Sequence, residues 1–91
     1  MIALSQDTKA FIDMCAGEVQ PVIKQDQNTG EQVIVGYHIV LFSFNVSFPV
    51  AFYQREEEAQ AMFVDLLACL KKGEEFYDFR AREQAVFSKK R

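Results

Sequence analysis

The histidine and the two cysteines of this sequence are its first candidates for nucleophilic catalysis or metal binding: His38, Cys15 and Cys69. A catalytic histidine needs a nucleophile or carboxylate beside it, and a metal ion needs two or three further ligands. The spacing supplies neither, although a distant pairing of Cys15 with His38 stays open. Gly30 and Gly36 belong to no GxGxxG or GxxxxGK(S/T) phosphate-binding pattern. The sequence therefore predicts no catalytic residue, no metal site, no cofactor and no enzymatic activity, with His38 as a partly buried sheet residue.

Charge is divided unevenly along the chain. Residues 1–70 hold three basic and nine acidic side chains, a formal charge of −6, whereas residues 71–91 hold seven basic and four acidic ones, a charge of +3. Such polarity is typical of a protein that binds something. The candidate partner-binding residues are Glu56, Glu57, Glu58, Glu74, Glu75 and Asp78, which could form one wide negative patch. The alternative is that the first three only stabilise the first turn of a helix.

The basic end supplies candidates for nucleic-acid contact. Arginines beside aromatic rings are what single-stranded nucleic-acid grooves use, and Arg80 and Arg82 would share one side of a strand close to Tyr77 and Phe79. The candidate nucleic-acid-binding residues are Lys71, Lys72, Arg80, Arg82, Lys89, Lys90 and Arg91. The alternative is that both rings are core and the last three residues form a solvated tail. An isoelectric point near 5.0 argues against a dedicated DNA-binding domain.

The elements that must position these residues begin with a predicted helix over residues 5–16. Ser5 is a plausible N-cap, Asp7 lies in the first turn, and Gly17 follows the end. One face of this helix is apolar at spacings of three and four, with Phe11, Met14 and Cys15.

A strand and a turn are predicted next. Residues 19–24 form a short extended run, and Pro21 confines it to a sheet edge or a strand start. Residues 26–30 have the composition of a turn in which Asn28 and Gly30 supply positive φ.

The strongest strand prediction lies in the middle of the chain. Residues 32–44 are rich in β-branched and aromatic residues on both faces, which is typical of a central strand, or of one covered by helices on one face and by a partner on the other. Gly36 marks a bulge or bend. Residues 46–53 alternate, and Pro49 places them at an edge. The residues predicted to share one face are Val46, Phe48, Val50 and Phe52.

Residues 55–72 predict the most secure helix, with acidic residues at its start, Lys71 and Lys72 at its end, and Gly73 beyond. Asp65 is expected to face outward. The expected buried stripe is Ala59, Met62, Phe63, Leu66, Leu67 and Leu70. For residues 75–82 alternation favours a further strand followed by a short helical or frayed tail, and a helix is the alternative. The fold class is thus α+β: a small antiparallel sheet of three to four strands with two helices, in the order α-β-β-β-α and a variable last element.

Length and composition predict one domain over residues 1–91, with residues 83–91 as a basic tail. An apolar content of 49% suffices for one core. The charged residues near the start are unlike a secretory signal, and no apolar run approaches the roughly 20 residues of a membrane span. The cysteines suit buried positions in a reducing compartment. We therefore expect a cytoplasmic protein.

Small size, a helix-flanked antiparallel sheet, an acidic body and a charged tail together resemble the anti-CRISPR proteins of bacteriophages, especially those directed at type I systems. The resemblance implies a stoichiometric inhibitor in the host cytoplasm that docks on Cas subunits and blocks recognition of target DNA. Its basic end is then expected to face guide RNA or an acidic subunit patch. It implies no small-molecule substrate and no membrane. A monomer is expected, with a homodimer through an exposed sheet edge as an alternative.

The segment FNVSFPVAFYQREEEAQAMFVDLLACL is also similar to the strand-then-helix unit of HicB-like antitoxins. That resemblance implies a small regulator or antitoxin whose basic C-terminal end contacts DNA or RNA. The usual sheet start and the glycine-rich loop of that family are missing here.

Overall fold

The computed structural model describes residues 1–14 and 16–88. This part of the chain forms six strands and two helices. In chain order they are β1 (Ile2–Leu4), β2 (Phe11–Asp13), β3 (Ala16–Gln25), β4 (Gln32–Ser43), β5 (Val46–Tyr53), α1 (Glu56–Lys71), β6 (Phe76–Asp78) and α2 (Phe79–Ser88). The strands form two three-stranded sheets. The predicted α+β class with two helices is confirmed, although the order of elements differs from the predicted one.

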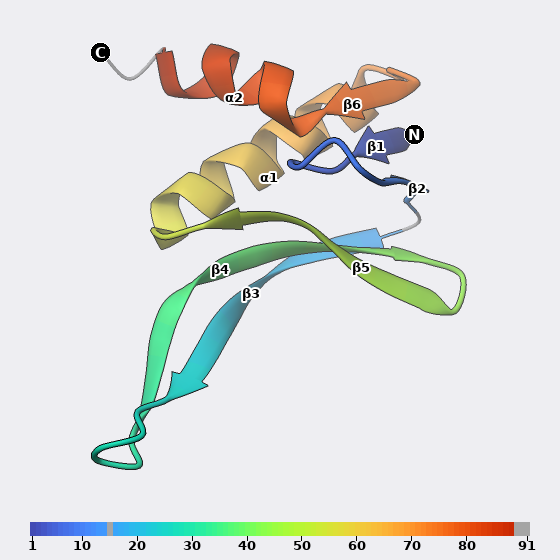
Figure 1. Cartoon of the computed structure of the whole chain (residues 1–91). Coiled ribbons are helices and arrows are strands. Elements are labelled where there is room, and N and C mark those ends of the chain that lie inside the picture. The colour runs from blue at the N-terminus through green and yellow to red at the C-terminus, as the bar shows by residue number, and fades with distance from the viewer. Residues whose placement is uncertain (15, 89–91) are drawn as a thin grey trace.

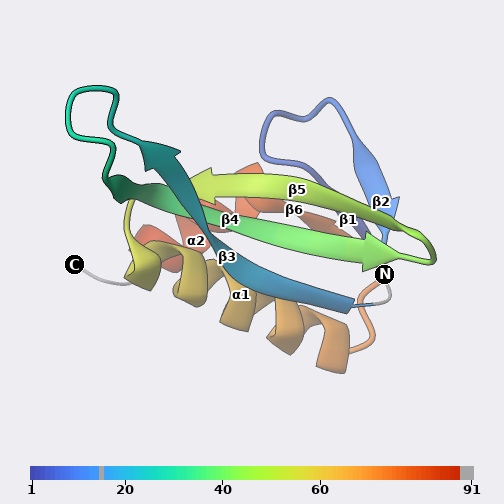
Figure 2. The ribbon, with the colours of Figure 1, turned by 90° about the horizontal axis from the view of Figure 1, so that it is seen from below.

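The larger sheet is antiparallel, with the strand order β3-β4-β5. β4 is central, as its apolar residues on both faces predicted. Pro21 and Pro49 lie on the two outer strands, as predicted, where a missing N–H can face away from the sheet. Both helices lie on one side of this sheet (Figure 1), and its opposite face has no helix in front of it (Figure 2).

A bulge interrupts the pairing of β3 with β4. The register changes from Val22↔Gly36 to Ile23↔Ile34, which leaves Val35 as an extra residue in β4. The irregularity therefore lies beside the glycine at which it was predicted. Bulges bend a strand and increase its twist, and beyond this one the β3–β4 hairpin extends away from the helices (Figure 1).

A second register shift, between Ile39 and Val40 of β4, changes which side chains of β5 are buried. Val50 is the extra residue there, so the predicted common face of Val46, Phe48, Val50 and Phe52 is interrupted. Val50 and Ala51 are both buried, whereas Phe48 remains 37% exposed. The predicted alternation was wrong at this point because a bulge reverses the order of faces.

Residues 26–30 form the predicted turn, and Gly30 has a φ of 74°. The expectation of a positive φ at Asn28 was wrong. Among the described non-glycine residues, positive φ occurs at Thr8 (60°) and Phe44 (53°). Phe44 thus occupies, in the tight β4–β5 turn, a conformation that costs an L-residue about 1–2 kcal/mol.

α1 confirms the predicted helix to within one residue at each end, and Gly73 follows it with a φ of 78°. Its buried residues are Ala59, Met62, Leu66 and Cys69. Leu67 and Leu70 are 40% and 41% exposed, so the predicted stripe was too wide. They form a flank of α1 that remains exposed. Asp65, expected to face outward, turns toward α2 instead.

The predicted helix over residues 5–16 was wrong. β1 forms the centre of the smaller sheet, antiparallel to β2 and parallel to β6. Ser5, the expected N-cap, closes the loop between β1 and β2: its N–H donates to the Ala10 carbonyl at 2.7 Å, and its hydroxyl donates to Asp7 at 2.6 Å. Pairing with strands on both sides of β1 outweighs the local helix pattern. Cys15 lies outside the described residues.

At the C-terminal end, the predicted strand is only three residues long. The Asp78 carboxylate accepts hydrogen bonds from the backbone N–H groups of Arg80 at 3.0 Å and Ala81 at 3.4 Å, which caps α2. The placement of Arg80 and Arg82 along one side of a strand was therefore wrong, because both lie on a helix. Of the predicted tail over residues 83–91, residues 83–88 are helical and the last three lie outside the described residues.

Candidate functional site

The predicted acidic residues do not form one patch. Glu56, Glu57 and Glu58 begin α1, whereas Glu74 and Glu75 follow its end. A helix of 16 residues separates the two groups by about 24 Å. Asp78 lies near the second group, where its carboxylate is engaged in capping α2. The expectation of one wide negative surface was wrong because the residues share a region of sequence but not an end of the helix.

The first-turn acids are as exposed as the acidic residues at the other end of α1. Glu56 and Glu57 are exposed, and Glu58 is half-buried. The Arg55 guanidinium lies 3.2 Å from the Glu57 carboxylate, with both side chains about two-thirds exposed. Such a pair contributes little stability. Both interpretations of these acids fit: they complement the helix dipole, and they face solvent where a partner can reach them.

The basic candidates are divided between two environments. Lys71 and Lys72 are exposed at the end of α1, beside Glu74 and Glu75, so charges of both signs mix there. Arg80 is exposed in the first turn of α2. The candidates Lys89, Lys90 and Arg91 lie outside the described residues.

Arg82 is held within the protein. Its Nε and one terminal nitrogen donate to the two carboxylate oxygens of Asp65 at 2.9 Å and 2.8 Å, and Tyr77 donates its hydroxyl to the same carboxylate at 2.8 Å. Hydrogen bonding to Asp65 raises the pKa of Arg82 above its ordinary value. Burial, followed by the hydrogen bond to Asp65, raises the pKa of Tyr77. The network joins α1, β6 and α2, so the Arg82 guanidinium serves the packing of α2.

A second polar network joins α2 to the edge of β5. The Glu83 carboxylate accepts hydrogen bonds from the Tyr53 hydroxyl at 2.5 Å and from the Gln6 side-chain amide at 2.7 Å. Gln6 also donates its backbone N–H to Val50 at 2.7 Å and accepts from the Phe52 N–H at 2.8 Å. Burial, followed by the hydrogen bond to Glu83, raises the pKa of Tyr53. Gln6 therefore covers the outer edge of β5.

The two rings considered for base stacking belong to the core. Tyr77 and Phe79 are 1% and 0% exposed, and their ring centroids lie 4.9 Å apart in an edge-on arrangement. Stacking on a base requires an accessible ring face. The structure thus favours the alternative in which both rings are core.

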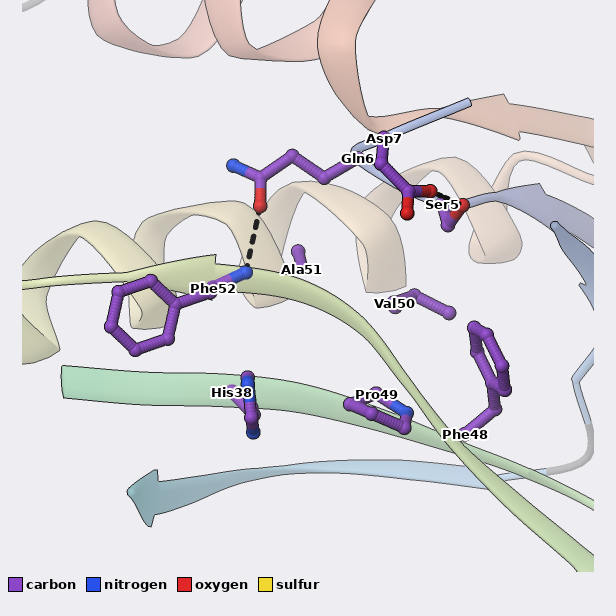
Figure 3. Close-up of a pocket in the computed structure, with 9 residues that line it drawn as sticks. All are labelled: Ser5, Gln6, Asp7, His38, Phe48, Pro49, Val50, Ala51 and Phe52. Atoms are coloured by element: carbon purple, nitrogen blue, oxygen red, sulfur yellow. Dashed lines mark hydrogen bonds between the residues drawn. The ribbon is translucent and has the colours of Figure 1, made fainter. Parts of the chain in front are cut away.

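His38 borders a shallow cleft of about 200 Å³ beside β5 (Figure 3). Its ring meets Phe52 edge-on, with centroids 5.5 Å apart. On the other side the Ser5 hydroxyl donates to Asp7, which lowers the pKa of that carboxyl. Ser5 is thus bound to Asp7 and not to a histidine. Within residues 1–14 and 16–88, no group of three or more histidine, cysteine or acidic side chains is placed to hold a metal ion.

Cys69 is a free, buried cysteine, as its position in the sequence predicted. Burial raises the pKa of its thiol, which favours the protonated and less reactive form.

Sequence reasoning missed three exposed apolar surfaces. One is the outer face of the smaller sheet, where Phe11 and Phe76 are 72% and 53% exposed. The second is the flank of α1 with Leu67 and Leu70. The third we call the arm, residues 23–35, where the hairpin extends beyond β5; its exposed apolar residues are Ile23, Val33, Ile34 and Val35. The signal for the arm was present in the sequence, since a strand apolar on both faces needs cover on both.

Comparison of the chain with protein-family models, curated proteins and solved structures gave no match. Among the described residues, no helix has the length and apolar character needed to cross a membrane.

Proposed function

We propose that this is a non-enzymatic protein that acts by docking on another protein. The observation that carries the proposal is the exposure of large apolar side chains on three separate surfaces of so small a chain. Isolated exposed apolar residues are ordinary, but contiguous groups of them mark interaction sites. The outer face of the smaller sheet and the arm are such groups, since their residues are neighbours across paired strands.

The resemblance to anti-CRISPR proteins defines the partner to test first. Under this proposal the protein is a stoichiometric inhibitor, working in the cytoplasm of a host cell, that docks on the Cas subunits of a type I surveillance complex. The acidic first turn of α1 faces a basic Cas surface that otherwise holds DNA, and so blocks target recognition. The exposed basic residues Lys71, Lys72 and Arg80 face guide RNA or an acidic subunit surface.

The test is binding of labelled target DNA by purified type I surveillance complexes, measured by fluorescence anisotropy with increasing amounts of the protein. We expect a stoichiometric loss of DNA binding and co-elution of the protein with the complex. The variant with Glu56→Gln and Glu57→Gln should inhibit less, most clearly at low salt. Its matched control, Glu74→Gln with Glu75→Gln, removes the same charge from the opposite end of α1. Unchanged DNA binding at a large excess of the protein would contradict the proposal.

The regulator or antitoxin alternative predicts a different result in a simpler assay. A regulator should bind a duplex or a single strand without any protein partner, with an affinity that falls steeply as salt rises. Such binding would favour the alternative and count against the inhibitor. Because Arg82 is engaged by Asp65, the candidate nucleic-acid-binding residues that remain within the described part of the chain are Lys71, Lys72 and Arg80, all exposed.

A further inference from the structure

Both long edges of the larger sheet carry features that prevent pairing with another strand. At the edge of β5, Gln6 occupies the backbone groups of Val50 and Phe52, and Pro49 has no N–H to offer. At the edge of β3, Pro21 interrupts the row of donors. Prolines and covering groups at edges are the devices by which proteins avoid edge-to-edge association. They disfavour the predicted alternative of a homodimer through either of these edges.

One stretch of edge lacks such protection. β5 ends at Tyr53, which pairs with Tyr37, whereas β4 begins five residues earlier, at Gln32. Residues 32–34 of β4 are therefore paired with β3 on one side, Val35 is the bulge residue beside them, and within the described part of the chain none of the four is paired with a strand on the other side. This stretch contains no proline and no charged side chain, and three of its four residues are β-branched.

The direction of its backbone groups follows from the alternation of an antiparallel ladder. The Phe52 N–H points away from β4, because it donates to the side chain that covers this edge. Its partner His38 therefore directs its own N–H and C=O toward β3. His38 pairs with Gln20 of β3, whose backbone N–H and C=O therefore point toward β4. Because this direction alternates from residue to residue, the backbone groups of Pro21 and Ile23 point toward the outer edge of β3. Ile34, the partner of Ile23, consequently directs its N–H and C=O away from β3, toward the empty side.

We propose that residues 32–35 form a site for β-augmentation, at which an extended segment of a partner protein adds a strand beside β4. The proposal rests on the proposed function and specifies where and how docking occurs. Main-chain hydrogen bonds to Ile34 supply the pairing, and side chains alternate between the two faces of the arm. On one face the cross-strand pair Ile23 and Ile34, 53% and 56% exposed, offers an apolar strip for the added strand to extend.

Charge at this end of the molecule specifies a basic segment. The arm and the first turn of α1 lie at the same end in both views (Figures 1 and 2). Together the arm and residues 55–58 carry five acidic side chains and two basic ones. The acidic ones are Asp26, Glu31, Glu56, Glu57 and Glu58, and the basic ones are Lys24 and Arg55. A strand in which lysine or arginine alternates with apolar residues complements both the charge and the apolar strip.

A second copy of this chain is a poorer occupant. Self-pairing at residues 32–35 would bring two equally acidic ends together, which is unfavourable. It would also join only four residues of each chain, far fewer than the roughly 20–30 residues a side of a stable dimer.

The experiment uses a synthetic eight-residue peptide of alternating lysine and valine with blocked ends, titrated into the ¹⁵N-labelled protein. We expect amide shift changes centred on residues 32–35 and slower hydrogen exchange of the Ile34 amide. The same peptide N-methylated on the residues that face β4 cannot pair and should not bind. Ile34→Pro removes the outward N–H without touching the ladder to β3, and should weaken binding about tenfold. The matched control Ile34→Val keeps the N–H and an apolar, β-branched side chain, and should bind as the parent does.

Any of three results in the peptide titration would overturn the proposal: equal binding of the methylated peptide, shift changes that avoid residues 32–35, or the same changes appearing with protein concentration alone, which would identify a second copy as the occupant. The methylated peptide keeps the test decisive even if Ile34→Pro does not fold. If a folded Ile34→Pro variant inhibits the surveillance complex fully, the β-augmentation site is refuted and the inhibitor function is retained. If the protein binds the peptide but does not inhibit the complex, the inhibitor function is refuted and the β-augmentation site is retained.

Discussion

Replacing Arg82 by methionine tests whether this arginine serves the fold or a ligand. Methionine keeps most of the aliphatic packing and removes the guanidinium. The Asp65 side chain is only 17% exposed, so it would lose two charge-assisted hydrogen bonds and keep the one from Tyr77. Breaking a fully buried pair costs about 3–5 kcal/mol. The Arg82 side chain is 38% exposed, so solvent screening reduces this, and we expect about 2 kcal/mol.

The assay is thermal and urea denaturation of Arg82→Met beside Arg80→Met, which removes an exposed arginine two residues away on the same helix. A loss of about 2 kcal/mol lowers the melting temperature of a domain of this size by roughly 10 °C. Arg80→Met should stay within about 0.5 kcal/mol of the parent. Combining Arg82→Met with Asp65→Asn should cost less than the sum of the single changes, because the two side chains interact. Equal stability of Arg82→Met and Arg80→Met would refute the reasoning and return Arg82 to the candidate binding residues.

Three further predictions follow from burial and backbone conformation. Leu66→Ala should destabilise the protein by about 2–5 kcal/mol in urea denaturation. Leu67→Ala, on the exposed flank of α1, should cost less than about 1 kcal/mol. Equal losses of stability would mean that the buried face of α1 is misassigned. Since folding raises the pKa of Tyr53 and Tyr77, their stabilising contribution is complete below the unfolded pKa of about 10 and is lost as pH rises above it. Phenolate absorbance should therefore show both tyrosines ionising only with unfolding, and their titration in the folded protein near pH 10 would contradict this. Phe44→Gly should raise the free energy of unfolding by about 0.5–1 kcal/mol, because glycine relieves the positive φ of a residue that is 92% exposed. Phe44→Ala should give no such gain in stability. A loss of stability with glycine would argue against a positive φ at residue 44.

Elements with local signals could be predicted from the sequence. α1 has acids in its first turn, apolar residues at helical spacing and Gly73 beyond its end, and each signal acts within a few residues. The central position of β4 was similarly evident from its β-branched residues. The burial of Cys69 and the edge positions of Pro21 and Pro49 follow from residue chemistry alone.

Elements that depend on distant pairing could not be predicted. A serine that can cap a helix can equally close a turn, because in both cases its hydroxyl bonds nearby backbone groups. Ser5 closes a turn and does not cap a helix, because the preceding strand β1 pairs with β6, more than 70 residues later. The ion pair of Arg82 with Asp65 could not be predicted for the same reason, because its two side chains meet only when α1 and α2 lie against each other. A strand over residues 75–82, as the alternation predicts, gives no reason to expect a contact with α1.

The candidate site was predicted least well, because charge along a sequence is a poor guide to charge on a surface. The basic residues Lys71 and Lys72 end beside Glu74 and Glu75, so the strong polarity of the sequence becomes a mixed surface at one end of α1. The arrangement of strand edges depends on position in the sheet and not on composition. It follows from β4 extending five residues beyond the end of β5, which no local pattern of residues encodes.

That arrangement bears directly on how the protein works. An unprotected strand rich in valine and isoleucine is an aggregation hazard, and Pro21, Pro49 and Gln6 reduce that hazard along the rest of the larger sheet. The same protection would be available to β4 through a single lysine or proline between residues 32 and 35, yet those four residues are Gln-Val-Ile-Val. A two-stranded ribbon of this kind is also only marginally stable in water by itself. An added strand from a partner would pair the free backbone groups, cover Ile34 and stabilise the arm at once. Under the proposed β-augmentation the exposed edge and the weakly stable arm have one common explanation, which is that this end of the molecule completes its fold on binding.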